Sequence, residues 1–478
     1  MSSPSTRGAI RWSRAGTLLL TALAGTIAGC EPSQSNETMT RARATNSELP
    51  AFFLGGIQVH EASLGGWFDA LEAQGMNTIQ VTDYARQGDW DTDDLSWEEK
   101  PSWVLDEIRG AQERGLAVAF VSRVHLAETA PRNEFLWHGM IMPKTEEQLA
   151  SWFEKYGRYV VEWAEIAERE GVDVFMIGSE LNALATTVPA TQPPGLEEYF
   201  LDAEKQEGRR SEVLAQEELI AEQHLEVSER EGYASVDAYI DARIEREREW
   251  AATVTGGDAS SLEAINRKRA VLDGHWRELI ARVRAVYSGK IGYAANFDQY
   301  PEVGFWSELD VMGINAYFSL RDRVLPDESE AQLYPLLLDG WRGVLKDIAD
   351  FRQRQQLADK PVIFTEMGYT YRAKSTLRPY AHEGFTLVHD PDNASEERQE
   401  YVVVWAEEPV RLEERAWAVR ALWQAHSALE QPLLDGILYW KLSSHDYHRD
   451  DEAFMVHIGE GTDDPVLPEL RRFLAPAG

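Results

Sequence analysis

Residues 174–182 read VFMIGSELN, and this stretch decides the fold. Its apolar, partly β-branched first half predicts a buried β-strand, which stops at a glycine and a serine directly before Glu180. Residues 361–369, PVIFTEMGY, repeat the design and put Glu366 at the end of the strand. Most glutamates are simply solvated loop residues. Two glutamates that each follow a buried strand are instead typical of the rim of a (β/α)₈ barrel, where that fold carries its functional side chains.

Segments with a helical period alternate with apolar strands on both sides of these two stretches. Strands are predicted at 52–59, 77–85, 116–126, 174–180, 290–298, 306–318, 361–366 and 433–442. Helices are predicted at 63–75, 101–115, 145–171, 275–289, 333–356, 414–429 and 467–474. Strands that are apolar on both faces are typical of a parallel sheet covered by helices. The sequence therefore predicts the α/β class, with one (β/α)₈ TIM barrel over residues 51–478.

Two long segments interrupt this alternation. Residues 188–260 follow the fourth strand and become rich in Glu and Arg, with opposite charges four residues apart, which predicts a helical insertion. Residues 371–412 follow the seventh strand, and the stretches 385–390 and 399–408 within them flank a turn-rich sequence that predicts a β-hairpin. The helical insertion can be read either as a solvated helical hairpin or as a wall of a binding cleft on the face that carries the glutamates.

The N-terminus has the features of a secretory signal. Three arginines precede the apolar run AGTLLLTALAGTIA, and residues 27–30 read IAGC. This resembles a bacterial lipobox, which implies a signal peptide over residues 1–29 and diacylation of Cys30. Residues 30–50 would then form a flexible polar tether. Glu31 rather than Asp after the cysteine favours the outer membrane, so we expect a lipid-anchored protein of the cell envelope on its periplasmic or surface side.

Composition excludes several kinds of partner. The formal net charge of −34 disfavours binding to nucleic acid or to anionic lipid, whereas 16 Trp and 17 Tyr suit a neutral ligand with flat apolar faces. Cys30 is the only cysteine, so with lipid attached the mature chain has no thiol or disulfide. The stretch 445–451, HDYHRDD, contains His-x-x-His, but no third ligand stands out elsewhere. We expect neither a metal nor a cofactor.

Five stretches together carry a family likeness: MIGSELN (176–182), YAANFDQY (293–300), FWSELDVMGINAYF (305–318), PVIFTEMGYTY (361–371) and GILYWKL (436–442). They resemble the family 113 glycoside hydrolases, a branch of the clan A (β/α)₈ enzymes. The likeness covers about residues 51–475 without the two insertions. It implies retaining hydrolysis of β-linked glycans, with β-1,4-mannanase as the best-known activity. It also implies Glu180 as acid/base and Glu366 as nucleophile.

The chemistry of glycoside hydrolysis requires such a pair independently. An oxocarbenium-like transition state needs an ionised carboxylate below the anomeric carbon and a protonated acid beside the leaving oxygen. Retention needs the two carboxyl groups about 5–5.5 Å apart, and repulsion at that separation raises the pKa of one of them. We predict that Glu180 holds the proton and that Glu366 stays ionised.

Other residues near strand ends are candidates for binding the sugar. The resemblance implies that Tyr317 hydrogen-bonds the nucleophile and that Trp440 provides a platform for the sugar ring. Further candidates are Asn296, Asn315, Arg123, His125 and Trp137.

The sequence departs from the clan at one position of the site. Most clan A families have Asn directly before the acid/base, where it contacts the sugar 2-hydroxyl. This chain has Ser179 there, and Asn182 lies two residues beyond Glu180. The departure leaves open a β-glycan other than mannan, such as a glucan or a mixed polymer. A glycan-binding surface lipoprotein without activity is the alternative from another class, although such a protein has no need of two strand-end glutamates.

Overall fold

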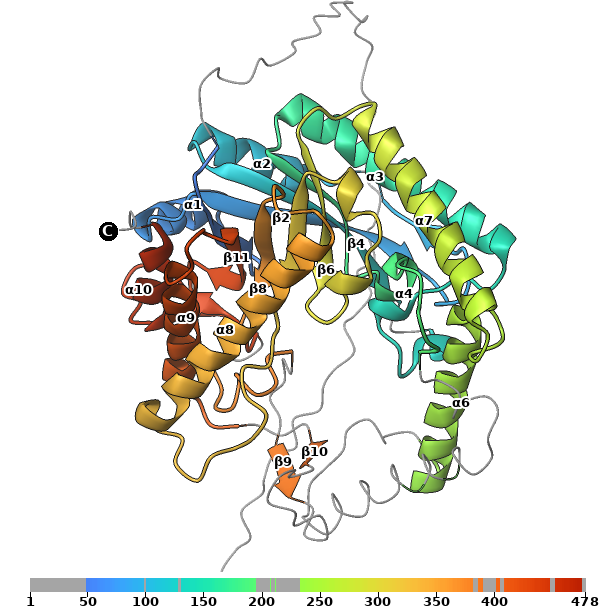
Figure 1. Cartoon of the computed structure of the whole chain (residues 1–478). Helices are drawn as coiled ribbons and strands as arrows, with labels where there is room; N and C mark the ends of the chain where they lie inside the picture. The colour runs from blue at the N-terminus through green and yellow to red at the C-terminus, as the bar shows by residue number, and fades with distance from the viewer. Residues whose placement is uncertain are drawn as a thin grey trace, which may run out of the picture. The chain divides into compact units, whose positions relative to one another are not determined.

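The computed structural model describes residues 49–98, 100–127, 130–194, 233–380, 386–389, 401–404, 408–447 and 452–474, together with Glu207 and Ser211. Within this part, eight parallel strands close a barrel (Figure 1). They are β1 (Phe53–Gln58), β2 (Thr78–Gln87), β4 (Ala117–Leu126), β5 (Val174–Ser179), β6 (Lys290–Asn296), β7 (Val311–Asn315), β8 (Val362–Met367) and β11 (Leu434–Ser443). Each strand pairs with the next, and β1 pairs with both β11 and β2. The predicted (β/α)₈ barrel is confirmed.

Helices surround the strands. The larger ones are α1 (Leu64–Ala73), α2 (Ser102–Glu113), α3 (Glu146–Glu170), α7 (Leu262–Arg284), α8 (Glu330–Arg354) and α9 (Leu412–Ser427), with the shorter α10 (Val466–Arg471) near the end of the chain. Helix α3 leads into β5. It begins with a capping box of Thr145 and Gln148 and ends at Gly171 in the left-handed conformation, φ 73°. These end signals are local, which is why the sequence predicted the bounds of this helix closely.

The apolar core has two layers. Nine buried residues pack together on the inside of the barrel, among them Phe53, Met176, Ile363 and Leu438. A much larger cluster fills the space between the strands and the helices, with fully buried tryptophans such as Trp276. A packed interior of this kind leaves polar chemistry to the carboxyl ends of the strands.

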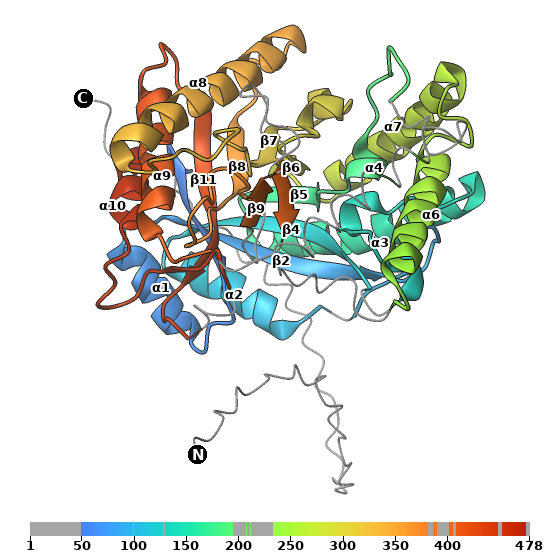
Figure 2. The same ribbon diagram turned by 90° about the horizontal axis from the view of Figure 1, so that it is seen from below.

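Some elements differ from the prediction. Strands β3 (Leu95–Ser96) and β12 (Val456–His457) extend the sheet beyond the barrel, and they are too short to leave a periodic pattern. Helix α7 begins at Leu262 rather than at residue 275, so it includes the stretch between the predicted insertion and the predicted helix. In the described part of that insertion, α6 (Val236–Val254) is helical and, in Figure 2, stands on the same side of the molecule as α3 and α7.

Several predictions fall on residues outside the described ranges. These are the signal peptide (1–29), Cys30, nearly all of the tether and most of residues 195–232. Within 371–412, β9 (Thr386–His389) and β10 (Tyr401–Val404) pair antiparallel, as expected of a hairpin. Among the helices that the structure describes, none is long and apolar enough to cross a membrane.

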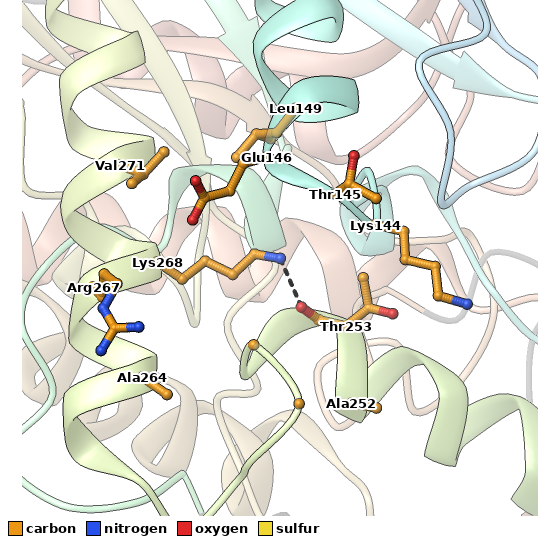
Figure 3. A pocket seen from close by; sticks show the side chains of 12 residues that line it. Lys144, Thr145, Glu146, Leu149, Ala252, Thr253, Ala264, Arg267, Lys268 and Val271 are labelled. Carbon is orange, nitrogen blue, oxygen red and sulfur yellow. Dashed lines mark hydrogen bonds between the residues drawn. The ribbon is translucent and has the colours of Figure 1, made fainter.

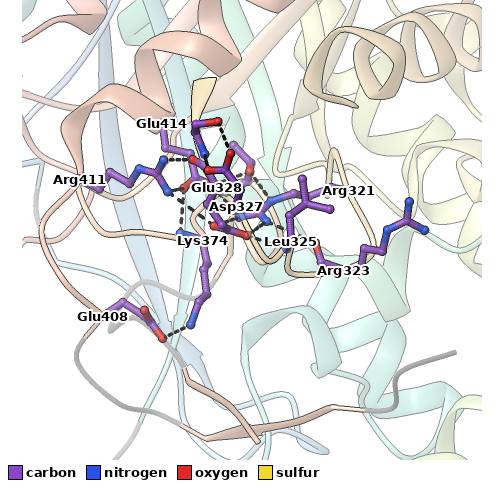
Figure 4. Close-up of polar contacts among 11 residues, drawn as sticks. Arg321, Arg323, Leu325, Asp327, Glu328, Lys374, Glu408, Arg411 and Glu414 are labelled. Atoms are coloured by element: carbon purple, nitrogen blue, oxygen red, sulfur yellow. Dashed lines mark hydrogen bonds and ion pairs between the residues drawn. The ribbon is translucent and has the colours of Figure 1, made fainter. Parts of the chain in front are cut away.

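A buried ionic cluster ties the stem of the second insertion to the barrel (Figure 4). The carboxylate of Glu414, which is fully buried, accepts hydrogen bonds from Arg321, from the main-chain N–H of Lys374 and from the N–H and hydroxyl of Thr376. Arg321 also pairs with Glu328. Because Arg321 follows β7 and Thr376 follows β8, the cluster fastens together two loops that leave the barrel at the same end.

We expect Arg321→Met to lower the free energy of unfolding by about 3–5 kcal/mol, because it removes the buried cation of Glu414 and leaves only the more distant and more exposed Arg411 beside that carboxylate. The Arg321 side chain is 1% exposed and that of Glu414 is 0% exposed. Urea unfolding followed by circular dichroism measures the loss. The matched control is Arg342→Met, which breaks an ion pair whose side chains are 55% and 71% exposed and should change stability by less than about 1 kcal/mol. Equal effects from both variants would contradict the role given to this cluster.

The carboxyl group of Glu107 on α2 is buried, and no cation among the described residues pairs with it. Burial raises the pKa of Glu107 to about 7, and hydrogen bonding to Gln58 offsets only part of this effect. Below about pH 4.5 the group is protonated in both folded and unfolded chains. As pH rises from there to about 7, only the unfolded chain releases the proton, and the fold loses about 3 kcal/mol.

Glu107→Gln should therefore stabilise the protein above neutral pH and change little near pH 4.5. Urea unfolding of the variant and the wild type at pH 4.5 and pH 8 tests this. Glu263→Gln serves as the control, since its side chain is 86% exposed. A gain from Glu107→Gln that is the same at both pH values would rule out titration as its cause.

Candidate active site

Strand β5 delivers Glu180 in an unusual backbone conformation. The φ angle of Glu180 is 51°, which is rare for a residue other than glycine and costs roughly 1–3 kcal/mol. The N–H of Glu180 donates to the carbonyl of Ala294 on β6, and the N–H of Leu181 donates to the hydroxyl of Tyr293 at 2.9 Å. These bonds hold the turn that aims the carboxyl over the end of the barrel.

Strand β8 delivers Glu366, which is 3% exposed and accepts three hydrogen bonds. One Nη of Arg123 and the amide of Asn315 (2.9 Å) donate to one carboxylate oxygen, and the hydroxyl of Tyr317 (2.7 Å) donates to the other. The guanidinium of Arg123 also lies over the ring of Trp440, 4.9 Å from its centroid. Three of the predicted site residues therefore bond Glu366, and a fourth, Trp440, packs against one of them.

The two glutamates meet at this end of the barrel. The amide of Asn315 donates to Glu366 and to the hydroxyl of Ser179, and its hydrogen bonding also acts on Glu180. The charge of Glu180 in turn raises the pKa of Glu366. Residues from three different strands thus converge on one pair of buried carboxyl groups.

The charges and hydrogen bonds around the two glutamates oppose the predicted protonation. Burial raises the pKa of Glu180, but the hydrogen bond and charge of His138, together with Asn315 and Arg123, bring it below its ordinary value. Burial raises the pKa of Glu366, Arg123 opposes this, and the Glu180 carboxylate adds to the rise. The two pKa values thus shift in the directions opposite to those expected for a protonated Glu180 and an ionised Glu366. The prediction did not include His138, which adds a hydrogen bond and a charge beside Glu180.

Sequence analysis missed two residues of the site. His138 lies in the short 3₁₀ helix η2 (His138–Met140), and its Nε2 is 3.3 Å from a carboxylate oxygen of Glu180. Nothing in the local sequence distinguishes it from an ordinary loop histidine. Tyr84 lies opposite Arg123 in the β2–β4 register and is close enough to feel the charges of both glutamates. Its place near the end of a barrel strand was a signal that could have found it.

The remaining predicted residues are placed less centrally. His125 and Trp137 line a pocket of about 330 Å³ together with His138. The side-chain oxygen of Asn296 accepts from the N–H of Phe297. Among the contacts of the described residues, neither Asn296 nor Asn182 reaches either glutamate.

A larger pocket, of about 420 Å³, lies away from this site between the start of α3 and helices α6 and α7 (Figure 3). Its central side chain is Lys268, whose ammonium donates to the carbonyl of Thr253 at 2.7 Å. Burial lowers the pKa of Lys268 to about 8. Neither glutamate lines this pocket, so we do not assign it to the site. Among the described residues, no group of three or more His, Cys, Asp or Glu side chains could hold a metal ion.

A family sequence model matches most of the chain, and solved structures share its fold. The sequence model of Glycoside Hydrolase Family 113 matches residues 61–188 and 239–431, which include Glu180 and Glu366. The GH113 beta-mannanase AaManA from Alicyclobacillus acidocaldarius is similar in structure, with a TM-score of 0.53 and 15% identity over 90% of this chain and 97% of that one. A GH113 beta-1,4-mannanase has a TM-score of 0.49 and 16% identity, over 88% of this chain and 97% of that one. No curated protein sequence matches the chain.

Proposed function

The chain belongs to glycoside hydrolase family 113, and from this premise we propose that it cleaves β-1,4-linked mannan or its oligosaccharides by double displacement. A polysaccharide or oligosaccharide substrate follows from the family. One observation supports this mechanism more strongly than any other. A buried glutamate with three hydrogen-bond donors faces a second buried glutamate from another strand.

In the first step, an oxygen of ionised Glu366 attacks the anomeric carbon while Glu180 gives its proton to the departing glycosidic oxygen. The C–O bond to the leaving sugar breaks, and an ester bond to Glu366 forms. Arg123 and the Asn315 amide can only donate, so they stabilise Glu366 as an anion. The first step therefore requires that Glu180 holds the proton of the pair.

In the second step, ionised Glu180 takes a proton from water, and the water oxygen attacks the anomeric carbon. The ester bond breaks and Glu366 leaves as a carboxylate. Two inversions at one carbon give net retention. Tyr317 donates to the carboxylate oxygen that Arg123 does not reach, and so it helps to hold Glu366 in line for both steps.

The identity of the sugar depends on contacts around the sugar residue whose anomeric carbon is attacked. Ser179 stands where most clan A families have asparagine, and its hydroxyl accepts a hydrogen bond from the buried amide of Asn315 at 3.2 Å. Trp440 is proposed as the ring platform, and Asn182, Asn296, His125 and Trp137 as further contacts. A panel of mannan, glucomannan and β-glucan with sizing of the products tests the proposal. Hydrolysis of β-glucan alone would reassign the substrate.

We also propose that Cys30 carries lipid and anchors the enzyme in the outer membrane, since residues 27–30 read IAGC after an apolar run. Metabolic labelling with palmitate and membrane fractionation, with Cys30→Ser as the control, test this. Label that persists in Cys30→Ser would contradict it.

A further inference from the structure

The pocket of about 330 Å³ beside Glu180 has the size and chemistry of a sugar site. Sites for small molecules typically have volumes of about 300–1,000 Å³. The pocket lies at the end of β4, where His125, Trp137 and His138 line it, and His138 contacts Glu180 at 3.3 Å. The pocket therefore lies next to Glu180, whose carboxyl group would protonate the leaving oxygen.

The lining suits a pyranose ring. Trp137 is 38% exposed, and its flat indole offers a surface on which the apolar face of a sugar stacks. The imidazoles of His125 and His138 can each donate to or accept from a hydroxyl group. The backbone behind them is fixed, because the Asn133 amide accepts from the N–H of Trp90 and donates to two carbonyls of neighbouring loops.

We propose that this pocket binds the sugar residue on the leaving-group side of the cleaved bond. We also propose that helix α6 of the first insertion keeps the pocket in shape. The proposal rests on the glycoside hydrolase function proposed above. It assigns a binding role to Trp137 and His138. It also assigns a positioning role to the helical insertion, for which the sequence allowed two readings, a solvated hairpin or a wall of the cleft.

Helix α6 holds the pocket loop through two contacts. The indole N–H of Trp250 donates to the carbonyl of Met140, the last residue of η2, at 3.0 Å. The ring of Phe135 packs edge-on against Tyr239, which is 1% exposed, with 5.5 Å between the ring centroids. These contacts lie on either side of Trp137 and His138 in the sequence, so α6 fixes both ends of the segment that lines the pocket.

Gly139 leaves the space that the indole of Trp137 occupies. A Cβ atom added to Gly139 would lie 2.3 Å from the ring of Trp137, far inside contact distance. Gly139→Ala must therefore push the ring aside while leaving every side chain of the pocket present. Gly139→Ala therefore tests the position of the Trp137 ring, whereas Trp137→Ala tests its presence.

The test compares a long substrate with one that has a single sugar. Mannotetraose spans neighbouring sites, whereas β-mannosyl fluoride, whose leaving group is a single atom, needs only the site of cleavage. We expect Trp137→Ala and Gly139→Ala to lower kcat/KM for mannotetraose roughly 10-fold to 100-fold, mainly through KM, because losing a stacked ring costs about 1–3 kcal/mol. Both variants should change kcat/KM for the mannosyl fluoride less than about 3-fold. Trp250→Phe, which removes only the bond to Met140, should show a smaller loss with the same dependence on substrate.

Trp103→Ala is the matched control, since Trp103 lies on α2 and is 55% exposed. It should leave both substrates unaffected, and thermal melts verify that all variants fold. Equal losses of a variant on both substrates, or no loss of Trp137→Ala on mannotetraose, would overturn the assignment of the pocket. A wild-type protein that cleaves neither substrate would instead overturn the proposed mannanase function.

Discussion

Glu366→Ala is expected to lower kcat/KM on a β-glycan by at least about 10⁴-fold, because no other group can form the ester bond to the anomeric carbon. Glu366 receives donors from Arg123, Asn315 and Tyr317, and none of these side chains can replace a carboxylate nucleophile. Hydrolysis followed by reducing-sugar release measures the loss. Because Arg123 is buried and would lose its anion, Glu366→Gln is made in parallel as the variant closest in shape to the wild type.

A small anion should restore activity to Glu366→Ala. With an aryl β-glycoside as substrate, azide can occupy the space left by the carboxylate and attack the anomeric carbon once, so the product is the α-glycosyl azide. The control is Glu263→Ala, an exposed change on α7 that should leave activity unaltered. Activity of Glu366→Ala equal to that of the wild type would exclude Glu366 as nucleophile, whereas a β-glycosyl azide would point to a different residue in that role.

Glu180→Gln is expected to lower kcat on an unactivated glycan by about 10²–10⁴-fold, the usual contribution of a general acid. An aryl glycoside with a very good leaving group needs no proton for bond cleavage, so its first step should slow by less than about 10-fold. The contrast between the two substrates separates the loss of an acid from a general collapse of the site. Single-turnover release of the aryl group measures the first step alone.

The second step provides the complementary readout for Glu180. Without this base, water attacks slowly, and azide, which needs no base, should speed turnover of the aryl glycoside and give the β-glycosyl azide. The alkaline limb of the pH profile on the glycan should also disappear, since the acid no longer titrates. An equal loss on both substrates with an unchanged pH profile would contradict the acid/base role.

The sequence predicted the fold and the glutamate pair because both depend on local patterns. Each barrel strand is a short apolar run with a sharp stop, and Glu180 and Glu366 follow two of these stops. Parallel strands put their ends at one rim, so Arg123 and Asn315 could be placed near that rim as candidates for binding the sugar, while the family resemblance implied that Tyr317 bonds Glu366. All three lie within hydrogen-bond distance of it.

What the sequence could not predict depends on contacts between distant segments. His138 meets Glu180 only because the loop after β4 folds over the end of β5, and Trp250 holds that loop from 110 residues away. The electrostatics of the pair depend in part on this same histidine, which the sequence-based assignment of the proton did not include. The role of the helical insertion stayed open for the same reason, since the α6 sequence shows opposite charges but not what the helix contacts.

Proton NMR of the first product tests the central claim most directly. A β-linked oligosaccharide is added to the enzyme, and the anomeric signals are recorded within minutes, before the sugar mutarotates. Double displacement by Glu366 and Glu180 predicts that the β-anomer appears first and that the α-anomer follows only through mutarotation. Initial appearance of the α-anomer would mean a single attack by water, and it would contradict the mechanism built on these two glutamates.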